Sequence, residues 1–165
     1  MTKAELRNGY NKVLFIDDRE PVRFLELVVE NCPIPIEMKR LPTGDYTCED
    51  VAIERKQIKD FANSIISKKK RLWTQSDRLK KEFKYPYILI SGKTKEDEND
   101  VTDHAMLGAM SYLACPKFDK SGNVISPPVT VLWVSDDRQL AYLILKILER
   151  HGKLKMPPPF ELYKI

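Results

Sequence analysis

The sequence has few of the side chains that bind soft metals or form disulfides. Its 165 residues include three cysteines, Cys32, Cys48 and Cys115, and two histidines. The cysteines are odd in number and widely spaced, so they predict reduced thiols of an intracellular protein rather than a disulfide framework or a zinc site. We therefore expect the protein in the nucleus if its host is eukaryotic, and in the cytoplasm or nucleoid otherwise. His104 and His151 are far apart in the chain, and each is expected at a helix end.

Long apolar runs are also missing. No stretch approaches the roughly 20 residues that a membrane-spanning helix requires, and the first residues do not show a signal-peptide pattern. We therefore expect no membrane association. The chain is long enough to bury a core without disulfides or metal. The sequence predicts one domain over 1–155, followed by a proline-rich tail over 156–165 that docks on the domain, a second subunit or a partner.

Positive charge is concentrated in one part of the chain. The net charge is +4, but residues 54–84 hold eleven Lys and Arg against four Asp and Glu, which leaves the remainder with a net −3. Lys68, Lys69, Lys70 and Arg71 form the densest cluster. Such a cluster predicts contact with the phosphates of DNA, although a solvated helix face is the ordinary alternative.

The most informative segment is 44–60, which contains Asp45 and the tripeptide Glu54-Arg55-Lys56. In a strand over 51–56, alternation places Glu54 and Lys56 on one face and Arg55 on the other. A carboxylate and an ammonium on one face, with Asp45 upstream, are typical of a site that binds Mg²⁺ or Mn²⁺ and orients a water for attack on a phosphodiester. The alternative is an ordinary surface ion pair.

A second acidic group follows an apolar run at 13–16, which predicts a buried strand. Asp17, Asp18, Arg19 and Glu20 come directly after it, where a strand's carboxyl end can open into a ligand site. The alternative is that one of these carboxylates caps the helix expected from residue 22.

Together these motifs resemble the nuclease domain of the XPF/Hef-type structure-specific endonucleases. The residues that carry the resemblance are 16–20, 41–46, 51–56 with Asp60, and 71–75. This family has a GD…ERKxxxD signature and is similar to the restriction-endonuclease-like PD-(D/E)xK group. The resemblance implies an α/β fold with a restriction-endonuclease-like mixed β-sheet flanked by α-helices. It also implies metal-dependent cleavage of branched, fork or flap DNA.

The resemblance assigns roles to individual residues as well. The metal, Mg²⁺ or Mn²⁺, would be bound by Asp17, Asp45, Glu54 and the carbonyl of Arg55. Lys56 would orient the attacking water, and Glu20 and Asp60 would support the site. The residues expected to hold DNA phosphates are Arg19, Arg55, Lys68, Lys69, Lys70 and Arg71.

Two other functions remain open from the sequence. The chain can be a catalytically silent DNA-binding or scaffold subunit, or a resolvase-like nuclease of the wider group. The tandem helix-hairpin-helix module that usually follows this domain is not visible in the sequence. A homodimer, or a heterodimer with a related subunit, is expected from the resemblance. The apolar residues proposed for its interface are Leu140, Leu143, Ile144, Ile147 and Leu148, extended by Met106 and Met110.

Periodicity predicts the remaining elements. Helices are expected over 22–31, 58–66, 73–83 and 105–114, and another from an N-cap at Ser135 to Gly152. Strands are expected around 36–38, after Gly44-Asp45, and over 51–56, 86–91 and 129–134. The segments 93–103 and 117–128 are expected to be loops.

Overall fold

The computed structural model describes residues 11–67, 70–93 and 103–156. The helices are α2 (Val22–Asn31), α3 (Ile58–Ile66), α4 (Arg71–Glu82), α5 (Asp103–Ala114) and α6 (Asp137–Arg150). The strands of the main sheet are β1 (Leu14–Asp17), β2 (Ile36–Lys39), β3 (Tyr46–Cys48), β4 (Val51–Gln57), β5 (Tyr85–Ser91) and β8 (Thr130–Val134). A separate two-stranded hairpin consists of β6 (Lys117–Phe118) and β7 (Val124–Ser126).

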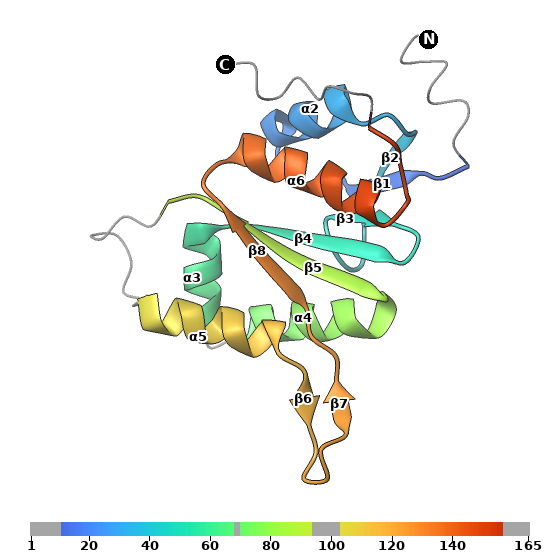
Figure 1. Ribbon diagram of the computed structural model, residues 1–165. Helices are drawn as coiled ribbons and strands as arrows, with labels where there is room; N and C mark the ends of the chain where they lie inside the picture. Colours follow the sequence, from blue (N-terminus) through green and yellow to red (C-terminus); the bar gives the residue numbers. More distant parts are fainter. Residues whose placement is uncertain (1–10, 68–69, 94–102, 157–165) are drawn as a thin grey trace.

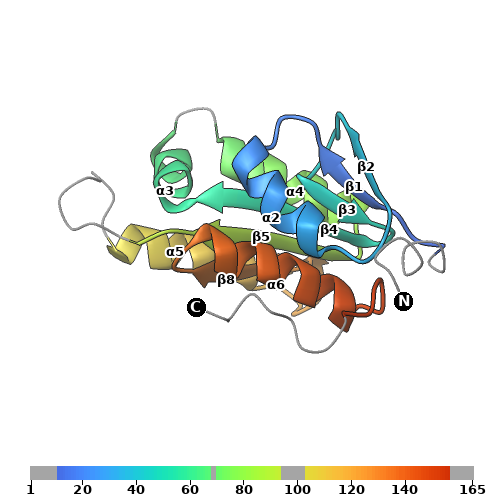
Figure 2. The same ribbon diagram turned by 90° about the horizontal axis from the view of Figure 1, so that it is seen from above.

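The main sheet is mixed, with strand order β2-β1-β3-β4-β5-β8. Strands β4, β5 and β8 run parallel, β1 and β2 run parallel, and β3 is antiparallel to both of its neighbours. Helices α2 and α6 cover one face and α3, α4 and α5 cover the other (Figure 1). Seen from above, α2 and α6 lie side by side over the sheet (Figure 2). The predicted fold, a mixed sheet flanked by helices, is confirmed.

Alternation along β4 divides its side chains between two apolar cores. Val51 and Ile53 pack with α2 and α6, whereas Ala52 packs with α3, α4 and α5. A two-residue turn joins β3 to β4 and sets this register, with Cys48 opposite Val51 and Glu49 at φ 53°. The turn therefore determines which residues of β4 face each side of the sheet, including Glu54.

The apolar set of α6 is used within the fold, which corrects one expectation. Leu140, Ile144, Ile147 and Leu148 are buried in the core against the sheet and α2, and Leu143 packs against the same core. Met106 is also buried, and Met110 packs beside it. The reason is that one face of each helix is fully occupied by the sheet. These residues do not form the free interface that we predicted.

The structure differs from the sequence-based elements at three further points. The segment expected as a loop over 117–128 contains the β6–β7 hairpin. Asp136, rather than Ser135, caps α6, since its side chain accepts a hydrogen bond from the main chain of Gln139. Helix α4 begins at Arg71, two residues earlier than predicted. The expected tail over 156–165 lies, apart from its first residue, outside the described residues.

The free thiols and the positions of the two histidines agree with the sequence prediction. All three cysteines are free. His104 lies at the start of α5, and His151 caps the end of α6. No helix within the described ranges is both long and apolar enough to cross a lipid bilayer.

Candidate nuclease site

Strand β4 places the central residues of the site. Glu54 and Lys56 lie on the face covered by α4, as alternation predicted, and Arg55 lies on the opposite face. Glu54 is 7% exposed. The Nζ of Lys56 lies 3.3 Å from Oε1 of Glu54, and both side chains are largely withdrawn from water. The pair is therefore not an ordinary surface salt bridge.

Asp45 precedes β3 and reaches the same pocket. Its Oδ2 accepts a hydrogen bond of 2.7 Å from the main-chain N–H of Arg55, and its own N–H donates to the carbonyl of Ile53 at 2.9 Å. Gly44, at φ 76°, provides the left-handed backbone that turns the chain into this position. Asp45 and Glu54 line one small pocket of about 240 Å³ with Arg19, Gln75 and Arg78.

Gln75, on α4, completes the arrangement, although the sequence assigned it no role. Its Oε1 accepts from Nζ of Lys56 at 2.8 Å, and its Nε2 donates to Oε1 of Glu54 at 2.8 Å. One amide thus holds the ammonium and the carboxylate in fixed positions relative to each other. The sequence signal was its place in the 71–75 motif, one turn into a helix that begins at a basic cluster.

The two carboxylates of the pocket are electrostatically crowded. Burial, followed by the negative charges of Glu54 and Glu20, raises the pKa of Asp45. Burial also raises the pKa of Glu54, against the opposing effect of Lys56. Two buried carboxylates that resist ionisation form a donor set that a bound cation stabilises.

Asp17 is fully buried, but it is engaged differently from the sequence prediction. Its oxygens accept hydrogen bonds from Nε and Nη2 of Arg19 at 2.7 and 2.8 Å, and from the main-chain N–H groups of Arg19 and Leu41, both at 2.9 Å. The Arg19 guanidinium, with these N–H groups, holds the pKa of Asp17 far below its usual range. Asp17 therefore ties the end of β1 to the loop before β3. Metal binding by Asp17, which stays a prediction, would require it to share these oxygens.

On the other face of the sheet, Arg55 and Glu20 form a buried ion pair. Nε of Arg55 lies 2.8 Å from Oε2 of Glu20, with 9% and 8% of the two side chains exposed. The hydroxyl of Tyr46 donates to the same oxygen at 2.7 Å, and the guanidinium lies 4.7 Å from the ring of Phe24. Glu20 thus anchors β4 from behind. The predicted contact of Arg55 with DNA would require its side chain to leave this pair.

The remaining predicted residues lie at the rim. Asp60 and Arg71 are exposed and line a groove of about 470 Å³ together with Lys56 and Gln75. Lys70 is exposed just before α4, at φ 50°. Lys68 and Lys69, predicted to bind DNA, lie outside the described residues.

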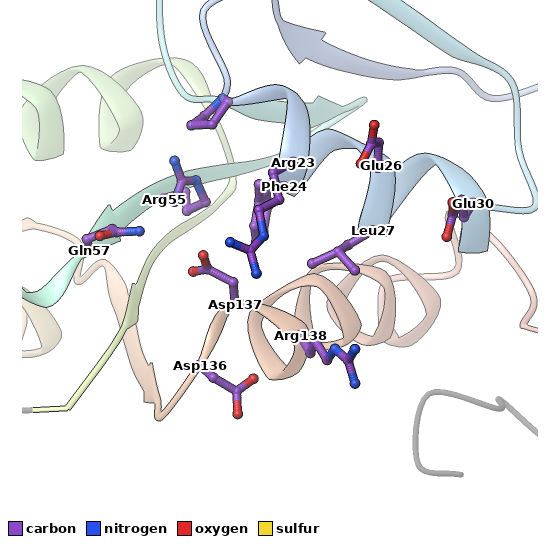
Figure 3. Close-up of a pocket in the computed structure, with 11 residues that line it drawn as sticks. Arg23, Phe24, Glu26, Leu27, Glu30, Arg55, Gln57, Asp136, Asp137 and Arg138 are labelled. Carbon is purple, nitrogen blue, oxygen red and sulfur yellow. The ribbon is translucent and has the colours of Figure 1, made fainter. Parts of the chain in front are cut away.

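A larger hollow of about 720 Å³ lies on the opposite face, between α2 and the start of α6 (Figure 3). Its lining includes Arg23, Arg55 and Arg138, and also Asp136 and Asp137. Neither Asp45 nor Glu54 lines this hollow, so it is separate from the pocket around Asp45.

The donor set at Asp45 and Glu54 fits a hard divalent cation. Within the described ranges, no group of three or more His, Cys, Asp or Glu side chains is placed to hold a metal. Two carboxylates nevertheless match the number that Mg²⁺ commonly uses together with substrate phosphate. The N–H of Arg55 points to Asp45, so its carbonyl points to the same side of β4, because a strand residue directs both groups the same way.

Comparison with known proteins shows the family to which the chain belongs. A model of the ERCC4 domain matches residues 16–117, which include the Asp45 pocket, β4 and α4. The chain belongs to the ERCC4 domain family. The resemblance to XPF-type nuclease domains is thereby confirmed.

Individual relatives of this ERCC4 domain come from archaea. The 3'-flap repair endonuclease Xpf of Saccharolobus solfataricus is 32% identical over 89 residues, which are 53% of this chain and 36% of that protein. A Methanocaldococcus jannaschii protein named as an ATP-dependent RNA helicase is 32% identical over 116 residues, 70% of this chain and 13% of that protein. The chain therefore spans well under two thirds of the length of each of these relatives.

The fold is shared with XPF from Aeropyrum pernix. The match has a TM-score of 0.67 at 21% identity, and covers 86% of this chain and 65% of that chain. The same protein in complex with DNA matches with a TM-score of 0.62 at 22% identity, with the same coverage of both chains.

Proposed function

We propose that this ERCC4 domain is a metal-dependent endonuclease that cleaves branched or flapped DNA. The observation that carries the proposal is the buried group of Asp45, Glu54, Lys56 and Gln75 at the end of β4. The names of two relatives support it, since one is a 3'-flap repair endonuclease and another was solved in complex with DNA.

The chain's own residues divide the work of hydrolysis. Asp45 and Glu54, helped by the Arg55 carbonyl, would hold Mg²⁺ or Mn²⁺, which supplies Lewis-acid polarisation of the scissile phosphate when bound. Lys56 orients the attacking water and offsets the charge that develops on the phosphate oxygens. Gln75 keeps the Lys56 ammonium beside Glu54, so that it is already positioned before substrate arrives.

Cations around the pocket suit a polyanionic substrate. Arg19 and Arg78 line the pocket itself, and Arg71 lines the neighbouring groove. Phosphate contacts of this kind position the backbone without reading its sequence. They fit a nuclease that selects DNA by shape.

The experiment is cleavage of labelled flap, fork and plain duplex DNA in Mg²⁺, Mn²⁺ or EDTA. We expect cleavage near the branch that requires metal. Asp45→Asn and Glu54→Gln should each abolish it, because each removes a charged metal ligand. Glu26→Gln, an exposed carboxylate on α2, is the matched control and should cut like the wild type.

The other outcomes assign the other functions. Equal cutting of duplex and flap would indicate a resolvase-like nuclease of the wider group. DNA binding without cleavage in any metal would indicate a silent scaffold subunit. Undiminished turnover in Asp45→Asn or Glu54→Gln would contradict the assigned site.

We also propose that the domain self-associates or pairs with a related subunit. Since α6 and Met106 are used in the core, the surface that supports this proposal lies along β8, the last strand of the sheet. Leu107 of α5 and Trp133 of β8 are 59% and 38% exposed and line a hollow of about 180 Å³. An exposed edge strand beside apolar side chains favours pairing with a second chain.

A further inference from the structure

The β6–β7 hairpin presents its apolar side to solvent and its polar side to the protein. It extends beyond the helical layers (Figure 1). Lys117 is opposite Ser126, and Phe118 is opposite Val124. The first pair faces the body: Nζ of Lys117 lies 4.4 Å from the Tyr112 ring centroid, and Oγ of Ser126 accepts a hydrogen bond of 3.0 Å from Lys80.

Alternation then directs Phe118 away from the body, and the extra residue between Val124 and Ser126 lets Val124, opposite Phe118, take the same direction. Each is 58% exposed. Ile125, the extra residue at the irregularity in the hairpin register, is 65% exposed. A hairpin that packs on a domain normally buries its apolar face and exposes its polar face to solvent. The outward apolar side chains bury little of their surface in the fold, which points to a ligand.

The hairpin is also held in shape without that ligand. Oδ1 of Asp119 accepts hydrogen bonds from the main-chain N–H groups of Ser121 and Asn123 at 2.8 and 2.9 Å, and its Oδ2 accepts from Nδ2 of Asn123 at 3.0 Å. Gly122, at φ 85°, completes the turn. A preorganised hairpin loses little conformational entropy when it binds.

The surrounding charge favours nucleic acid as the ligand. Lys120 is exposed at the turn of the hairpin, and Lys117 and Lys80 of α4 lie at its base. The hairpin's one carboxylate, Asp119, is directed into its own turn. A protruding apolar surface flanked by cations matches the way proteins stack unpaired bases or wedge between them.

Helix α4 connects this hairpin to the cleavage site. Gln75 holds Lys56 and Glu54, and Lys80 binds the hairpin at Ser126. Five residues of helix correspond to a rise of about 7.5 Å, which is about two nucleotide steps of about 3.4 Å along one DNA strand. The match to the ERCC4 domain model ends at residue 117, so nearly all of the hairpin lies beyond the matched residues.

We propose that the outer face of the β6–β7 hairpin binds an unpaired DNA strand beside the cleavage site, with a base stacked on Phe118. The inference rests on the proposed function, because it places the single-stranded arm of a branched substrate on this chain. It gives the domain its own means of distinguishing an arm from plain duplex.

The test compares binding of three DNAs in EDTA: a single strand, a duplex, and the duplex with a single-stranded arm. Phe118→Ala combined with Val124→Ala should weaken binding to the single strand and the armed duplex about tenfold, with little change for plain duplex. Phe118→Trp should retain binding, because it preserves the stacking surface. The matched control is Val22→Ala combined with Met38→Ala, two exposed apolar residues on other elements, and it should bind all three DNAs like the wild type.

Several results would overturn the inference. They are unchanged binding in the hairpin variant, an equal loss on all three DNAs, or a change in molecular mass by light scattering, which would make the hairpin a protein interface. Cleavage in Mg²⁺ separates this inference from the proposed function. If the wild-type protein binds single-stranded arms through Phe118 but does not cleave any DNA, only the proposed nuclease function is refuted. Hairpin variants that bind and cut like wild type refute only the hairpin site.

Discussion

Arg55 serves both faces of the sheet at once. Its main-chain N–H holds Asp45 in the pocket, while its guanidinium is fixed to Glu20 and rests on Phe24 behind the sheet. Because a buried ion pair is costly to break, the pair of Arg55 and Glu20 holds the strand in place from the face opposite the pocket. The position of Asp45 therefore depends on residues that contact neither metal nor DNA.

The buried carboxylate of Asp45 should make the metal-free protein less stable as pH rises. Its pKa is raised to about 8 in the fold, chiefly by burial, so the folded state retains a proton that the unfolded chain loses above about pH 4. The resulting loss of stability accumulates between about pH 4 and 8. The substitution Asp45→Asn removes this pH-dependent loss of stability. The amide oxygen of the new side chain can still accept the hydrogen bond from the main-chain N–H of Arg55. We expect its melting temperature to exceed that of the wild type by a margin that grows from pH 5 to pH 8.

Thermal melts in EDTA across that pH range measure the margin. Mg²⁺ should raise the melting temperature of the wild type more than that of Asp45→Asn, because the cation stabilises the ionised carboxylate. Asp119→Asn controls for the loss of an exposed, hydrogen-bonded carboxylate whose pKa is lowered, and its effect should have the opposite sign. A margin that does not vary with pH would show that Asp45 ionises normally.

At this scale the sequence identified the carboxylates but not what holds them. Asp45, Glu54 and Lys56 could be predicted because they lie within one short segment, where strand alternation determines relative direction. The contact of Gln75 with Lys56 and that of Arg55 with Glu20 could not be predicted, because they join residues 19 and 35 positions apart in the chain. Such contacts depend on how helices dock, and local periodicity does not determine that.

Helix α4 carries a cationic stripe across the site. Arg71, Gln75 and Arg78 follow the i, i+4, i+7 spacing of one helix face, so the two guanidinium groups lie on either side of Gln75. Both arginines are exposed. In the proposed nuclease, this geometry would place one cation on each side of the phosphate that is cleaved.

We expect Arg71→Gln combined with Arg78→Gln to weaken duplex binding and to flatten its salt dependence. Two lost phosphate contacts should reduce the slope of log K against log salt by about 1.8. Arg23→Gln combined with Arg138→Gln is the matched control, since these exposed arginines lie on α2 and α6, across the sheet. Titrations at several salt concentrations provide the slopes, and an equal change in both double variants would rule out a specific role for α4.

Long periodic elements were predictable from the sequence, and short ones were not. Helices α2 and α3 begin and end where periodicity placed them, because an apolar stripe along a helix of nine or ten residues has one way to pack against the sheet. The hairpin was missed because β6 and β7 are two and three residues long, and because its apolar residues face outward. Ser135 and Asp136 are both good N-caps, so only the structure distinguishes them.

For the whole molecule, the expectation is a dimer that forms along β8. Leu107→Arg should yield a monomer, since burying an unpaired guanidinium in an apolar contact is strongly unfavourable. Light scattering at micromolar concentration measures the mass, and Val22→Arg, at an exposed residue on α2, is the control that should remain a dimer. A monomeric wild type that retains full cleavage would refute this assembly.

The two-residue turn between β3 and β4 has a consequence for how the protein can change over evolution. Substitutions at Glu49 or Asp50 do not change which side chains of β4 lie on each face of the sheet. A single inserted or deleted residue there would exchange the strand's faces and direct Arg55 and Gln57 toward α4 in place of Glu54 and Lys56. The turn can therefore change in composition but not in length, and one inserted or deleted codon would be enough to remove Glu54 and Lys56 from the proposed site.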